Sequence, residues 1–98
     1  MKKIFSLSST NHKPARQVEL VKAEINKYIS RERRKKLPEG AGFWDFDCKC
    51  GRNETAPLII HVSQIGKEID KLFESEAENI YIEILAKPGP RIKKIEND

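Results

Sequence analysis

Apolar residues recur along the chain with two periods, one typical of strands and one typical of helices. Residues 2–7 and 79–87 alternate between apolar and polar side chains, which predicts a strand at each end of the chain. Residues 43–50 lie between glycines and are rich in aromatic residues, which predicts another strand. In that strand the side chains of Trp44, Phe46, Cys48 and Cys50 would share the buried side.

A helical period follows the first strand. Its apolar positions are Val18, Val21, Ile25, Tyr28 and Ile29. Pro14 suits the first turn of a helix, and Pro38 with Gly40 predicts an end near Lys36 or Leu37. A second helix, with Ser63 as its N-cap, would bury the apolar residues Ile65, Ile69, Leu72 and Phe73.

Two segments complete the pattern. Residues 58–62 fit either a short hairpin strand or an extended lead-in to the second helix, and the sequence leaves both open. Residues 88–98, rich in proline, glycine and lysine, are expected to form a flexible basic tail. The order β-α-β-(β)-α-β predicts an α+β fold, a two-layer sandwich with both helices on one face of a three- or four-stranded sheet. Strands joined through a helix could be parallel.

Length and composition narrow the class of protein. A chain of 98 residues suits a single domain, residues 1–98, and holds no apolar run long enough for a membrane span or a secretory signal. We therefore expect a cytoplasmic protein with reduced cysteines. The net charge of +4 is unevenly distributed, because residues 1–43 hold eleven Lys/Arg against four Glu, whereas residues 44–98 hold eight against eleven Asp/Glu. This asymmetry favours an anionic partner on one side of the molecule.

The run RERRKK, residues 31–36, is the most informative charged segment. Cations suit the last turn of a helix, so part of the run has a local explanation. At 100° per residue, however, Glu32 and Lys36 occupy the apolar stripe, so we expect the last two turns to overhang the sheet. On the same projection Lys13, Arg16, Lys27, Arg31 and Arg34 fall within a band about 60° wide, typical of a surface that follows a phosphate backbone. The predicted nucleic-acid-binding residues are Lys13, Arg16, Lys27, Arg31, Arg33, Arg34, Lys35 and Lys36.

Three other groups of residues are candidate sites. Cys48 and Cys50 lack the spacing of a zinc knuckle, even with His12 and His61 as further ligands, so we interpret them as core residues. Asp45, Asp47 and Glu83 could hold Mg²⁺ on the open side of the sheet, but no base or phosphate loop accompanies them. His61 beside Ile60 and Val62 is typical of a packed strand-end residue.

The segments PARQVELVKAEINKYISRERRKKLPEG, FWDFDCK and ILAKPGPRIKK resemble a family of small uncharacterised bacterial proteins of about this length. The likeness spans nearly the whole chain. It implies a bacterial cytoplasmic protein and supplies no catalytic residues. Cys50 and Pro90 depart from the family pattern, which argues against a site that requires Cys50.

These observations favour a non-catalytic module that binds an anionic partner such as RNA through the first helix. The alternatives are a protein-interaction or regulatory subunit that meets an acidic partner, and a metal-dependent phosphate-ester enzyme that uses Asp45, Asp47 and Glu83. We predict no catalytic residue, metal, cofactor or membrane partner, and the sequence does not decide the oligomeric state.

Overall fold

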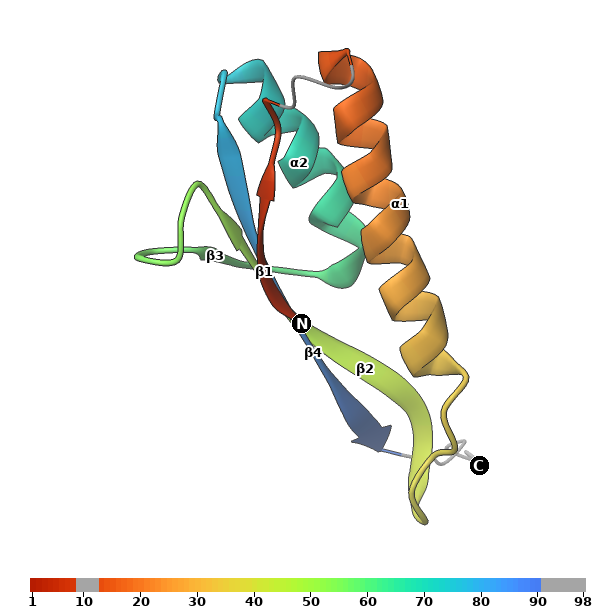
Figure 1. The fold of residues 1–98 in the computed structure, drawn as a ribbon. Helices are drawn as coiled ribbons and strands as arrows, with labels where there is room; N and C mark the ends of the chain where they lie inside the picture. Colours follow the sequence, from red (N-terminus) through yellow and green to blue (C-terminus); the bar gives the residue numbers. More distant parts are fainter. Residues whose placement is uncertain (9–12, 91–98) are drawn as a thin grey trace, which may run out of the picture.

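The computed structural model describes residues 1–8 and 13–90. Their elements are β1 (Lys2–Ser6), α1 (Pro14–Arg33), β2 (Ala41–Gly51), β3 (Leu58–Ile60), a 3-10 turn η1 (Val62–Gln64), α2 (Ile65–Glu74) and β4 (Asn79–Pro90). The four strands form one sheet in the order β1-β4-β2-β3, and both helices cover the same face of it (Figure 1). The predicted α+β sandwich with the order β-α-β-β-α-β is therefore confirmed.

All neighbouring strands in the sheet are antiparallel, and the parallel direction expected for strands joined through a helix holds for strands that are not neighbours. Each helix still joins two strands that run in the same direction, but an antiparallel third strand separates them. β4 lies between β1 and β2, and β2 lies between β3 and β4. The two β-α-β units are thus interleaved, which places the longest strands, β2 and β4, in the centre.

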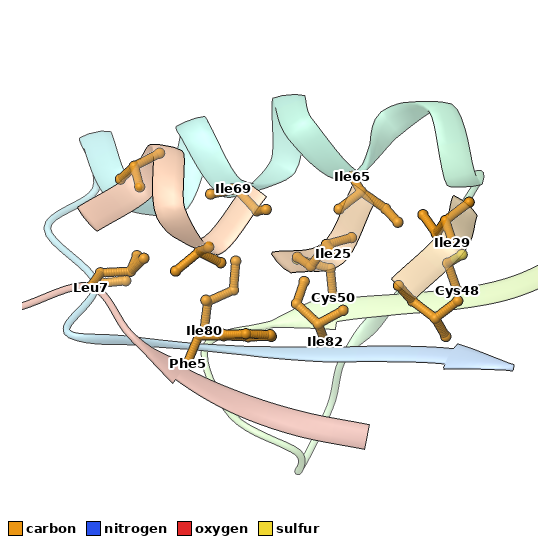
Figure 2. Close-up of a cluster of buried hydrophobic side chains, with 14 of the residues drawn as sticks. Phe5, Leu7, Ile25, Ile29, Cys48, Cys50, Ile65, Ile69, Ile80 and Ile82 are labelled. Carbon is orange, nitrogen blue, oxygen red and sulfur yellow. The ribbon is translucent and has the colours of Figure 1, made fainter. Parts of the chain in front are cut away.

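The core lies between the sheet and the helices (Figure 2). Ile25 and Ile29 of α1 meet Ile65 and Ile69 of α2 above the buried side chains of β2 and β4. Ile80, Ile82 and Ile84 have no exposed surface. This is the side of β2 on which the alternation placed Phe46, Cys48 and Cys50, and all three are buried.

The structure shows that segment 58–62 contains a short strand, and it corrects the start predicted for the second helix. Leu58–Ile60 pairs with Cys48–Cys50 as a short antiparallel strand. Ser63 is not an N-cap, because His61 Nδ1 accepts a hydrogen bond from the Ser63 N–H at 3.1 Å. Gln64 Oε1 in turn accepts from the His61 N–H at 2.9 Å. This reciprocal cap belongs to η1, which leads directly into α2.

The C-terminal ends of α1 and β4 differ from the ends expected from the sequence. α1 ends at Arg33, three residues before Lys36, where the Arg34 N–H donates to the Arg31 carbonyl at 3.2 Å. Residues 88–90, expected in the flexible tail, instead pair with β2 as the end of β4. Residues 91–98 lie outside the described part of the chain. Prolines 88 and 90 are tolerated there because this stretch of β4 has β2 as its one strand neighbour, which leaves the other edge without a ladder to complete.

Candidate nucleic-acid interface

The eight predicted binding residues are all exposed. Val18, Val21, Ile25 and Ile29 are the buried residues of α1, so the opposite side of the helix faces solvent. The band of five cations falls on that opposite side. We call the surface formed by Lys13, Arg16, Lys27, Arg31 and Arg34 the basic ridge.

The ridge consists of two groups of cations rather than one continuous line. Lys13 and Arg16 lie at the start of α1, and Lys27, Arg31 and Arg34 lie at its end. Arg16 and Lys27 are eleven positions apart, which is about 16 Å along a helix. The half-buried Leu20 lies in this gap on the same side of the helix.

The acidic group beside the ridge is neutralised within the chain. Glu24 projects next to Lys27 and Arg31, and its carboxylate forms an ion pair with Lys3 of β1. The second acid near the end of α1, Glu32, pairs with Lys35 at 2.8 Å. Within residues 1–8 and 13–90, none of the five ridge cations forms a salt bridge. The positive charge of the ridge is therefore free to meet an external anion.

The C-terminal group of cations surrounds a shallow depression. It is open to solvent, has a volume of about 510 Å³, and is lined by Glu24, Lys27, Ser30, Arg31 and Arg34. Ser30 adds a hydroxyl among the cations. With the Glu24 charge balanced by Lys3, this hollow presents three cations and one hydrogen-bonding hydroxyl to a ligand, which suits a phosphate group.

The end of α1 does not overhang the sheet, contrary to expectation. Arg33 Cζ lies 5.4 Å from the centroid of the Phe46 ring, and Trp44 Nε1 donates to the Lys35 carbonyl at 2.8 Å. Figure 1 shows β2 and β4 continuing beyond this end of the helix. The helix can lack apolar residues here because β2 supplies the aromatic rings on which Arg33 and the backbone of Lys35 rest. Arg33 thus has a packing role, and Arg31 and Arg34 do not share it.

The cations at the two ends of α1 differ in their effect on the helix. Arg31 and Arg33 in the last turn favour the helix dipole, so helix stability accounts for their charge. Lys13 is the N-cap, makes no side-chain capping bond, and is followed by a first turn without an acidic residue. Lys13 and Arg16 therefore oppose the dipole, and the stability of α1 does not explain their presence.

Each of the three carboxylates considered as a Mg²⁺ site is hydrogen-bonded to a different partner within the chain. Asp47 pairs with Lys87 at 2.8 Å, and this hydrogen bond raises the pKa of the Lys87 ammonium. Glu83 accepts a hydrogen bond from the Tyr81 hydroxyl at 2.8 Å, which raises the pKa of Tyr81. Asp45 accepts from the Phe46 N–H at 2.9 Å. Among the described residues no cluster of three His, Cys, Asp or Glu side chains is placed to hold a metal ion.

Cys48 and Cys50 lie in the core, as the alternation in β2 predicts. Each is 2% exposed. Burial, with a contribution from Asp47, raises the pKa of the Cys48 thiol to about 11. Burial also raises the pKa of Cys50 to about 12. Protonated, enclosed thiols are poor nucleophiles and poor metal ligands, so the arrangement fits packing. His61 is engaged in the cap of η1, and His12 lies outside the described residues.

The comparisons with known proteins identify the family and go no further. A model described as "Family of unknown function (DUF6172)" matches residues 1–95. The chain belongs to this family. No curated protein and no solved structure matches the chain. The family supplies no substrate, ligand or partner, so the site has to be interpreted from its own chemistry.

Sequence reasoning missed two residues of this surface. Lys3 neutralises Glu24 from β1, and Ser30 lines the depression. Ser30 could have been found, since it lies one helical turn from Lys27 and Arg34. The Lys3–Glu24 pair had no sequence signal, because the two residues meet through tertiary packing alone.

No helix in residues 1–8 and 13–90 is both long enough and apolar enough to cross a membrane.

Proposed function

We propose that this protein is a non-catalytic nucleic-acid-binding module, with RNA as the favoured ligand, and that the basic ridge contacts the phosphate backbone. The observation that carries the proposal is the charge state of the ridge. Five exposed cations share the outer side of α1, without a salt bridge to any described residue, and the neighbouring acid is already paired with Lys3. Polyanions gain affinity on such a surface by releasing counterions.

Two further features support a ligand over helix stability as the reason for this charge. Lys13 and Arg16 oppose the dipole of α1, so they cost stability at the helix start. The ridge spans 22 residues from Lys13 to Arg34, which is about 32 Å of helix and long enough to contact several successive phosphates.

The ridge supports backbone contact better than base recognition. Phe43 is the one exposed aromatic residue in the described part of the chain, and it lies on β2, away from α1. Base stacking, the usual source of affinity for unpaired bases, has no side chain to use on the ridge itself. We therefore expect affinity to vary little with RNA sequence.

The test is a binding titration with a mixed-sequence single-stranded RNA of about 12 nucleotides, read by fluorescence anisotropy. Arg31→Gln/Arg34→Gln should weaken binding about tenfold or more near 0.1 M salt and flatten the salt dependence, because two phosphate contacts are lost. Arg33 is left unchanged because its contact with Phe46 belongs to the packing.

Lys67→Gln/Lys71→Gln on α2 is the matched control, since it removes the same charge from exposed positions away from the ridge. This control should bind almost as well as the wild type. Equal losses in both variants would show that net charge, and not the ridge, drives binding. Absence of RNA binding at low salt would overturn the proposal and leave an acidic protein surface as the partner for the ridge.

A further inference from the structure

Within residues 1–8 and 13–90, no helix covers the side of the sheet away from α1 and α2. Ile4 of β1, Leu85 of β4 and Ile59 of β3 lie on this side, as the register with their neighbours requires, because Ile80, Ile82 and Ile84 face the helices. We call this side the open face. Figure 1 shows both helices on the opposite side of the strands.

Large apolar side chains are concentrated on the open face. The exposed fractions are 54% for Ile4, 40% for Phe43, 82% for Ile59 and 43% for Leu85. These four are on the open face, and the fifth exposed large apolar residue in the described part of the chain, Leu58, is in the adjoining edge strand β3. The Phe43 ring lies directly over Gly89, where an added Cβ would come within 2.4 Å of the ring. The aromatic ring is thus held flat at one end of the face.

The charged residues of the open face cancel one another. The register of the strands places Lys2, Lys49 and Lys87 on this face together with Asp45, Asp47 and Glu83. Three cations against three anions give no net charge, in contrast to the ridge on α1. Lys49 lies opposite Glu83, and Lys87 pairs with Asp47, so both signs occur side by side. A neutral face that carries both signs suits neither a polyanion nor a strongly charged protein, whereas a second copy brings equal numbers of cations and anions to it.

A second copy stacked on this face would keep the two basic ridges apart. Packed sheets lie about 10 Å apart, and each helix layer adds about 10 Å on its outer side. The ridges would then be separated by more than about 30 Å, several times the Debye length of about 8 Å at physiological salt. The net positive charge of the chain therefore does not oppose this arrangement.

The area of the face fits an association of modest strength. The four strands contain 5, 11, 3 and 12 residues. With a rise of about 3.3 Å and a strand spacing of about 4.8 Å, they cover roughly 500 Å² before side chains are counted. Specific interfaces bury about 600 Å² or more per partner, so the strands of the open face alone fall somewhat below that range, as expected for a weak association.

We infer that the open face is the contact between two copies of this chain, which stack sheet to sheet with Ile59 and Leu85 in the interface. The dimer forms at high concentration and dissociates on dilution. Each copy keeps its basic ridge on the outside, so association and anion binding use different residues.

Sedimentation equilibrium of the full chain, from about 5 to 300 µM, tests the inference. The wild type should pass from the monomer mass of 11.3 kDa toward twice that value. Ile59→Lys and Leu85→Lys should each weaken the association at least tenfold, because both place a charge against an apolar surface. Both residues are exposed in the single copy, so circular dichroism and thermal unfolding of the dilute variants should match the wild type.

Ala15→Lys, on the exposed surface of α1, is the matched control, since it adds the same charge on the other side of the molecule and should leave the dimer unchanged. A wild type that remains at 11.3 kDa at the highest concentration would overturn the inference. A dimer that persists in both variants would overturn it as well. Arg31→Gln/Arg34→Gln should still dimerise, so a failure of RNA binding and a failure of association are distinguishable.

Discussion

The two faces of the sheet are made by the same strands, yet they have opposite chemistry. On β4, Ile82 and Ile84 have no exposed surface, whereas Leu85, the residue after Ile84, is 43% exposed. On β2 and β4 the covered face is apolar, whereas the open face mixes isolated apolar residues with three lysines and three acids. Ile82 and Ile84 are therefore expected to stabilise the single copy more than Leu85 does, because the helices cover them. This contrast leads to predictions that differ by face.

The largest difference is expected between Ile82→Ala and Leu85→Ala. Truncation of Ile82 leaves a cavity under α1 and α2 and should lower the free energy of unfolding by about 2 to 5 kcal/mol. Truncation of Leu85 should cost less than about 1 kcal/mol in the single copy, because water already reaches much of the side chain. Urea unfolding at dilute concentration measures both values. Similar losses would mean that the open face is covered within one copy.

The cysteines give a second, chemical measure of the covered face. With pKa values of about 11 and about 12, Cys48 and Cys50 should hold roughly a hundredfold to a thousandfold less thiolate at pH 8 than ordinary thiols. Their reaction with an aromatic disulfide reagent should be slow in the folded protein and fast in urea. An exposed reference thiol, Ala15→Cys, should react fast in both conditions, and rapid modification of the native pair would contradict the assignment to the core.

The same shifts determine the effect of alkaline pH. The unfolded chain loses its thiol protons near the ordinary value of 9.0, whereas the folded chain keeps them to about 11 or 12. Above pH 9 the unfolded state therefore binds fewer protons, and the free energy of unfolding falls as pH rises. Below pH 9 the contribution of both thiols is fully present.

The smallest effect is expected for the ion pair of the open face. Asp47 and Lys87 are about half exposed and lie 2.8 Å apart, so water and salt screen their attraction. A double-mutant cycle with Asp47→Asn and Lys87→Gln should give a coupling of about 0.2 to 1 kcal/mol that falls further in 1 M salt. A coupling above about 2 kcal/mol would indicate a site sheltered from solvent.

The periodicities predicted the strands and helices because each element buries one side. The alternation in residues 43–50 identified the buried side of β2, including both cysteines, and the apolar stripe of α1 identified its inner side. Errors arose at the ends of elements. α1 ends early, next to the point where Trp44 Nε1 donates to the Lys35 carbonyl, and β4 continues through two prolines because β2 pairs with it along one edge. These events depend on contacts between distant residues.

The candidate site was predictable in composition and less so in geometry. Helical spacing identified all five ridge cations, and they are exposed as the projection requires. The overhang was wrong because the projection cannot show that Phe46 and Trp44 lie under the end of the helix. The neutralisation of Glu24 by Lys3 was also invisible, since it joins β1 to α1 across the fold.

By itself the sequence determined the types of the two helices and of β1, β2 and β4, the inward sides of these elements and the line of cations on α1, because these follow from local periodicity. The tertiary structure alone decided the strand order, the antiparallel pairing, the partners of the charged side chains and the neutrality of the open face. These properties depend on which distant segments become neighbours, and a repeat of two or 3.6 residues carries no information about that choice.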